Sequence, residues 1–155
     1  MKIRQVTINN KKKSLDVRTS KGVYSLPYVK LRIRPTLTDP VASAFVDREL
    51  ANRGVTYRLR SGREDSVHLD AFLDYNRDPA FMRDLTLHKM TIQALKLFRQ
   101  SGLSKHEVIR RLSTSPSHLY RLLNPACYGK SVDEMLRLLW VLGYGVDVKI
   151  FKQAA

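Results

Sequence analysis

The residues whose types could do chemistry gather between Ser115 and Arg121. Ser117, His118 and Arg121 fall within the first two turns of an expected helix that starts at Pro116. A guanidinium can donate two parallel hydrogen bonds to a guanine edge, and a serine hydroxyl can reach most base edges. A helix that presents a short row of such side chains suits the major groove of duplex DNA.

Other kinds of site find less support. The four histidines do not pair at metal-ligand spacing, and no carboxylates cluster with them. His68 and Asp70 could form a dyad, although an ordinary strand pair explains them better. The single cysteine, Cys127, excludes an internal disulfide and a cysteine-based zinc cluster and fits a reducing setting. The sequence therefore predicts neither an enzyme nor a metal or cofactor site.

Two short helices must position the polar residues. Ser104 and Glu107 form a predicted capping box, and an apolar face follows at helical spacing up to Leu112. Ser115 is a second N-cap, with proline at the first helical position. An ordinary helical hairpin would show the same periodicity. The two caps, the arginines and the overall charge favour a DNA-binding pair.

Residues 103–124 resemble the helix-turn-helix of the phage repressor and Cro type, often called Xre-like. The resemblance extends over residues 85–150 and implies a repressor-like domain of four to five helices. It implies a phosphate contact by Lys105 and DNA-facing positions for Ser115, Pro116, Ser117 and Arg121. Asn124 stands where the family often has Asn just past the second helix, and we expect His118 to face the bases beside Ser117 and Arg121. Three residues depart from the family pattern: Ile109 replaces the usual Ala of the helix crossing, Ser113 the usual Gly of the turn, and Pro116 a polar residue.

The flanking segments complete the expected helical domain. Asp78 and Pro79 predict the start of a long helix that ends near Gly102. In the Xre-like family the loop after the second helix crosses the DNA backbone, so the resemblance makes Tyr128, Lys130 and Ser131 candidate phosphate contacts. A capping box at Ser131 opens a helix that is apolar on most sides, so we expect it to be buried, Trp140 included.

Residues 146–150 alternate as a strand that needs a partner. That partner is either the N-terminal sheet or the same strand of a second copy. The resemblance favours the second copy and implies a homodimer.

Residues 1–75 predict a β-rich meander, with a clear hairpin between Val55 and Leu69 and a short helix near residue 72. Residues 41–50 fit either a helix or a strand, and no internal repeat is evident. A weaker likeness links this part to a small β-rich bacterial domain of unknown function found ahead of Xre-like helices. We therefore expect an α+β chain with a basic β-rich domain at 1–75 and the helix-turn-helix domain, ending in a short strand, at 76–155.

The net charge of +14 and the pI near 10.2 favour a polyanionic partner, nucleic acid before membrane. Between Met1 and Arg34, ten Lys or Arg face one acid, a formal charge of +9. These cations could form an additional surface that contacts phosphates. Alternatively, they could be edge-strand lysines that limit sheet-to-sheet aggregation. No signal peptide or transmembrane run is evident, so we expect a cytoplasmic protein.

The sequence thus predicts a DNA-binding transcriptional regulator that binds duplex DNA as a homodimer. One alternative is an antitoxin-like protein that neutralises a toxin-like partner. Another is a β-rich unit that binds or cleaves RNA, although it lacks an evident catalytic group and has few aromatics for base stacking.

Overall fold

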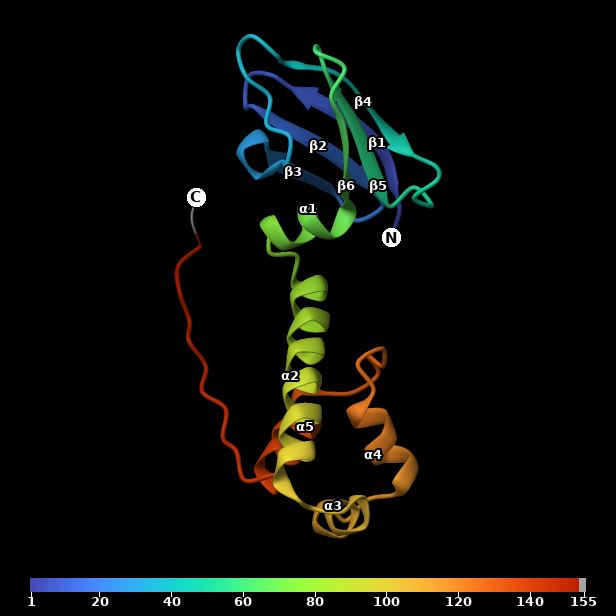
Figure 1. The fold of residues 1–155 in the computed structure, drawn as a ribbon, viewed down its shortest axis with the longest axis vertical. Helices are drawn as coiled ribbons and strands as arrows, with labels where there is room; N and C mark the ends of the chain where they lie inside the picture. Colours follow the sequence, from blue (N-terminus) through green and yellow to red (C-terminus); the bar gives the residue numbers. More distant parts are fainter. Residues whose placement is uncertain (154–155) are drawn as a thin grey trace. The chain divides into compact units, whose positions relative to one another are not determined.

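The computed structural model describes residues 1–153 and has the α+β class, with strands first and helices after (Figure 1). Contacts divide the chain into two compact units, one ending at Met82 and the other starting at Arg83. Within residues 1–153, no helix is long and apolar enough to cross a membrane.

The first unit contains two three-stranded antiparallel sheets, each built by consecutive strands. The first sheet comprises β1 (Ile3–Asn9), β2 (Ser14–Thr19) and β3 (Val23–Pro27), and a short 3-10 helix η1 (Tyr28–Lys30) follows it. The second comprises β4 (Val41–Asp47), β5 (Gly54–Leu59) and β6 (Glu64–His68), and helix α1 (Leu69–Tyr75) follows it. The ambiguous segment at 41–50 is therefore a strand in its first part.

The two sheets repeat one pattern, so the expectation of no internal repeat is wrong. In the first hairpin Ile3 pairs with Thr19, and in the second Val41 pairs with Leu59. Both hairpins shift register directly after that pair and then stay aligned to the turn. We call β1–β3 with η1 the first repeat, and β4–β6 with α1 the second repeat.

Each repeat also has a side-chain hydrogen bond between equivalent positions of its first two strands. The carboxylate belongs to the second strand in the first repeat and to the first strand in the second repeat. In the first repeat the Asn9 amide donates to the Asp16 carboxylate at 3.0 Å. In the second, the Thr56 hydroxyl donates to the carboxylate of Asp47 at 2.7 Å. The hydrogen bond from Thr56 lowers the pKa of Asp47. Burial raises the pKa of Asp16, but hydrogen bonds from Asn9 and neighbouring hydroxyls outweigh it and lower that pKa as well.

One apolar core joins both repeats and α1. Leu15 and Val55 occupy equivalent positions in β2 and β5, and both are fully buried. Phe72 of α1 is also fully buried in this core. The core needs both repeats, because a three-stranded sheet alone has no second layer against which to bury its apolar face.

The second unit is helical. It contains most of α2 (Pro79–Ser101), followed by α3 (Lys105–Leu112), α4 (Pro116–Leu123) and α5 (Val132–Val141). The Asp78 carboxylate accepts from the amide of Phe81 at 3.0 Å, as its predicted N-cap role requires. Gly102 ends α2 with a φ of +69°, a conformation that glycine adopts without steric cost.

The second core is built from all four helices and includes Leu87, Val108, Leu119 and Leu138, each at most 1% exposed. Val108 comes from α3 and Leu119 from α4, so these two helices turn their apolar faces inward together. Their other faces are left to solvent.

One of two expectations about the end of the chain is wrong. Within residues 1–153, residues 146–150 join neither sheet of the first unit, and their pairing with a second copy stays a prediction. Trp140 is 77% exposed rather than buried. It lies four and eight positions after Leu136 and Val132, which are also exposed, so α5 has an apolar stripe on its outer side.

Candidate nucleic-acid interface

The start of α4 presents polar side chains to solvent. Ser115 is its N-cap, and its hydroxyl accepts from the amide of His118 at 3.2 Å. Pro116 occupies the first turn, where a missing amide hydrogen leaves no acceptor unpaired. Because leucines occupy the inner face of α4, Ser117 and Arg121 lie exposed on the outer one. This is the arrangement that the sequence predicts.

Helix α3 is capped differently from the prediction. The Ser104 hydroxyl accepts from the amide of Glu107 at 3.1 Å, but the reciprocal half of the capping box is not formed. The Glu107 carboxylate instead accepts from Arg110 at 2.7 Å and from Arg111 at 2.8 Å. These two guanidinium groups lower the pKa of Glu107 to about 2.

The turn between α3 and α4 passes through a left-handed residue. Ser113 has φ 51° and ψ 50°, the conformation that glycine favours. Its amide donates to the Arg110 carbonyl at 3.1 Å, and the Thr114 amide donates to the Ile109 carbonyl at 3.1 Å. The backbone therefore turns as a glycine would allow, although serine stands there.

A cation–π contact joins the two helices at their exposed faces. The Lys105 ammonium lies 4.8 Å from the centroid of the Tyr120 ring, which is 57% exposed. Such a contact at an exposed site is worth about 0.5–1 kcal/mol. It places a positive charge beside the polar face of α4.

Arg121 and His118 meet a carboxylate from α5. The Arg121 guanidinium donates to Glu134 Oε1 at 3.0 Å and to His118 Nδ1 at 2.8 Å. Since a guanidinium only donates, Nδ1 accepts and the ring proton lies on Nε2, 3.5 Å from Glu134 Oε1. The other oxygen of Glu134 accepts from the Ser131 amide at 2.7 Å, which completes the predicted capping box of α5.

Lys130 does not lie at the surface, which overturns its predicted phosphate contact. It is 2% exposed, and its ammonium donates to the carbonyls of Leu122 at 2.8 Å and Asn124 at 3.0 Å. The Leu122 carbonyl lies in the last turn of α4, where intrahelical amide donors run out, and the Asn124 carbonyl also accepts from the Cys127 amide at 3.1 Å. Burial lowers the pKa of Lys130. The side chain closes the C-terminal end of α4.

The loop before α5 is held from α2. The Arg83 guanidinium donates to the carbonyls of Tyr128 at 3.2 Å and Lys130 at 3.1 Å. The Tyr128 ring stays 42% exposed. The loop is therefore anchored through its backbone while its aromatic side chain remains accessible.

Most of the predicted residues share one exposed region, formed by α4 with the start of α3. Lys105, Ser115, Ser117 and Arg121 are exposed there, and His118 is partly buried. Two further residues of this region, Tyr120 and Glu134, were not among the predicted site residues. Helical spacing predicts that Tyr120 is exposed beside Arg121, but it does not indicate the contact with Lys105, and nothing local in the sequence connects Glu134 to Arg121.

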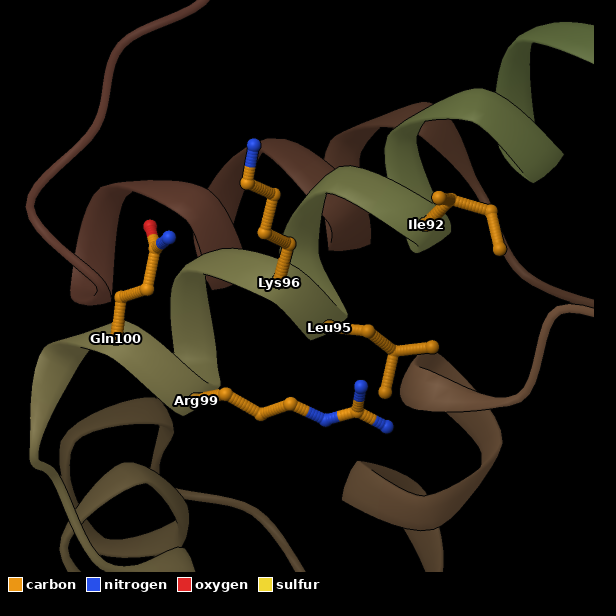
Figure 2. Close-up of a pocket in the computed structure, with 5 residues that line it drawn as sticks. All are labelled: Ile92, Leu95, Lys96, Arg99 and Gln100. Carbon is orange, nitrogen blue, oxygen red and sulfur yellow. The ribbon is translucent and has the colours of Figure 1, made fainter.

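The second unit also has an open groove along α2. Its volume is about 460 Å³, and it is lined by Ile92, Leu95, Lys96, Arg99 and Gln100. Figure 2 shows these five side chains along successive turns of α2. Two of them are aliphatic, two are cationic and one is an amide, so this lining combines apolar surface with positive charge.

Metal binding also finds no support in residues 1–153, because no three His, Cys, Asp or Glu side chains there could surround an ion. No protein-family model, curated protein or solved structure matches the chain significantly. Any function proposed for the chain therefore depends on the geometry of the region around α4 and on the sequence pattern that produces it.

Proposed function

We propose that this chain is a sequence-specific DNA-binding protein of the Xre/Cro helix-turn-helix type, which regulates transcription as a homodimer. The main support is the exposed polar side of α4, where Ser117 and Arg121 lie opposite the buried Leu119 and Leu122. A helix that buries one face and offers a serine and an arginine on the other can lie in the major groove. The net charge of +14 favours the polyanion.

In this proposal Ser117, His118 and Arg121 face the bases. Lys105, Ser115 and Tyr128 hold phosphates, which fix the register of the helix without reading sequence. Lys130 has no part in the interface, because its ammonium is buried against the end of α4.

The ion pair of Arg121 with Glu134 does not prevent base recognition. Its side chains are 44% and 28% exposed, and a surface pair of this kind is worth about 0–1 kcal/mol. A bidentate pair with guanine is worth about 1–3 kcal/mol of discrimination. Guanine can therefore replace Glu134 as the partner of Arg121, and in the free protein Glu134 keeps the guanidinium extended near its working position.

The homodimer is supported by the self-complementary pattern of residues 146–150. If two copies pair antiparallel about Val148, then Val146 faces Ile150 and Asp147 faces Lys149. Val146, Val148 and Ile150 are exposed in the single chain, at 47%, 76% and 91%. Figure 1 draws this extended segment in red after α5. A dimer would supply the two-fold symmetry that such DNA readers use.

The test is selection of binding sites from random duplex DNA at physiological salt. The affinity of variants for the selected site is then measured. We expect Arg121→Ala to cost about 1–3 kcal/mol on the selected site and to relax the preference at one base position. Lys105→Ala should weaken binding to all sequences alike, because it removes a phosphate contact.

Arg137→Ala is the matched control, since Arg137 is an exposed α5 arginine that pairs with Asp133 at 3.3 Å, outside this region. If Arg121→Ala and Arg137→Ala bind the selected site with the same affinity and base preference, the assignment of Arg121 is wrong.

A second candidate is an antitoxin-like protein that binds and neutralises a partner protein, with DNA binding secondary. The exposed stripe of Val132, Leu136 and Trp140 on α5 favours it, since such patches mark protein contacts. Co-purification of a second small protein, abolished by Trp140→Ser, would support this candidate.

A further inference from the structure

Four lysines lie at one end of the first repeat, and we call this group the lysine end. It consists of Lys11, Lys12, Lys13 and Lys30. The first three form the β1–β2 turn, and the fourth is the last residue of η1, which begins next to that turn. The Tyr28 amide donates to the Lys13 carbonyl at 2.8 Å, and the Tyr28 hydroxyl donates to Asn10 at 3.2 Å. All four lysines are exposed.

Their charges are not neutralised by the protein. Of the ten Lys or Arg between Met1 and Arg34, only Arg32 forms an ion pair among residues 1–153, with Asp65 at 2.5 Å. The single acid of that stretch, Asp16, feels the charge of Lys12, but its oxygens accept from Asn9 and Ser14 instead. The lysine end therefore presents positive charge to solvent.

The second repeat has the same strand order and register but a different charge. Residues 35–75 contain five Lys or Arg and seven Asp or Glu, a formal charge of −2. Three of the five cations are ion-paired, in Arg53–Asp70 at 3.4 Å, Arg58–Glu64 at 2.6 Å and Arg63–Asp39 at 2.9 Å. The fold of a repeat therefore does not require unpaired cations.

The difference between the repeats also disfavours lysines that merely limit aggregation. Each sheet has two edge strands, so each repeat faces the same risk of edge-to-edge pairing. Only the first repeat has the excess of lysines, and three of the lysine end's four members lie in a turn rather than on an edge strand. Protection against edge-to-edge pairing therefore does not account for the excess of lysines in the first repeat.

We propose that the lysine end is a second DNA-binding surface, which contacts the phosphates of duplex DNA independently of sequence. This inference rests on the proposed function, because it takes the DNA that α4 reads as the polyanion. Lysine ammonium groups act as mobile point charges toward phosphates. Tyr28, the aromatic ring at this end, is half-buried, which disfavours the base stacking that single-stranded RNA would use.

The experiment compares two double variants that remove the same charge from the two repeats. Lys11→Gln/Lys12→Gln removes two positive charges from the lysine end and leaves Lys13, which has a left-handed backbone, in place. Arg48→Gln/Arg60→Gln removes two exposed arginines from the second repeat, both without an ion pair among residues 1–153. The probe is a mixed-sequence DNA duplex, titrated at several salt concentrations, and thermal melts confirm that both variants fold.

We expect the lysine variant to bind about 3- to 10-fold more weakly at physiological salt. The slope of log K against log salt should fall by about 0.9 for each phosphate that the variant no longer neutralises, and the arginine variant should keep the wild-type slope. Equal weakening in both variants, or none in either, would overturn the proposal. So would weakening confined to single-stranded RNA. The mixed-sequence duplex measures binding that does not depend on sequence, whereas Arg121→Ala on the selected site tests base recognition by α4. The two experiments can therefore fail independently.

Discussion

The Glu134 side chain forms hydrogen bonds with two helices, α4 and α5. Its Oε2 atom accepts from the Ser131 amide at the start of α5, and its Oε1 atom accepts from Arg121 of α4. The hydrogen bond from the Ser131 backbone is the main cause that lowers the pKa of Glu134. The carboxylate is therefore ionised at neutral pH, and the position of Arg121 depends on the helix cap beside it.

Glu107 makes the stability of α3 depend on pH. Its pKa falls from an ordinary 4.5 to about 2 in the folded chain, because Arg110 and Arg111 stabilise the ionised form. A lowered folded pKa adds stability above the unfolded pKa, and this stability is lost as pH falls toward the folded value. Glu107→Gln should thus lower the melting temperature at pH 7, and the difference from wild type should vanish between about pH 4.5 and pH 2.

Thermal melts across that pH range measure the effect. Asp133→Asn is the control, since both side chains of the Asp133–Arg137 pair are more than 70% exposed. A wild-type-to-variant difference for Glu107→Gln that stays constant down to pH 2 would contradict this origin of the stability.

At the scale of elements, α4 is capped by a side chain at each end. Ser115 closes its N-terminal end through a hydrogen bond within the same turn. Lys130 closes its C-terminal end from eight residues beyond Leu122, through a buried ammonium. The exposed residues of α4 are therefore presented by a helix that is capped by side chains at both ends.

Lys130→Met should destabilise the second unit by about 1–3 kcal/mol, because it removes the side-chain donor of the Leu122 carbonyl and one of the two donors of the Asn124 carbonyl. Urea unfolding measures the change. Lys89→Met, which alters an exposed lysine of α2, should shift the unfolding midpoint much less. Equal midpoints for the two variants would mean that the buried ammonium does not contribute net stability.

The elements that the sequence predicts well are those with local signals. The caps at Ser115 and Ser131 and the stop at Gly102 act on amides or torsions within one turn, so the residues themselves indicate them. Arg121 and Glu134 are 13 residues apart, and their pairing depends on how α4 and α5 pack. The exposure of Trp140 was not predicted, because an apolar helix face does not reveal whether a partner covers it.

The repeat is hard to see in the sequence for a related reason. Equivalent core positions keep their apolar character but not their identity, as with Val17 and Tyr57. Strand pairing depends on backbone register, which many sequences can satisfy. The repeat is therefore visible in the strand register, while the residue types at equivalent positions differ.

At the scale of the whole molecule, the proposed dimer makes a testable demand on residues 146–150. In antiparallel pairing about Val148 this residue meets its own copy, so Val148→Asp places two like charges directly opposite and should disrupt the dimer. Lys152→Asp lies beyond the paired stretch and should leave it intact. Sedimentation equilibrium of the full chain distinguishes the two outcomes. A Val148→Asp protein that remains dimeric would place the dimer contact elsewhere, with the stripe on α5 as the next region to test.

The carboxylate lies on opposite strands in the two repeats, and this difference limits which substitutions each repeat can accept. Asn9→Asp alone would set a second acid against Asp16, and Asp47→Asn alone would leave Thr56 facing an amide instead of an anion. Each substitution should cost less when its cross-strand neighbour is replaced as well. Positions 9 and 16, like 47 and 56, should therefore vary as coupled pairs among related sequences, and each pair offers a ready template for redesigning the other.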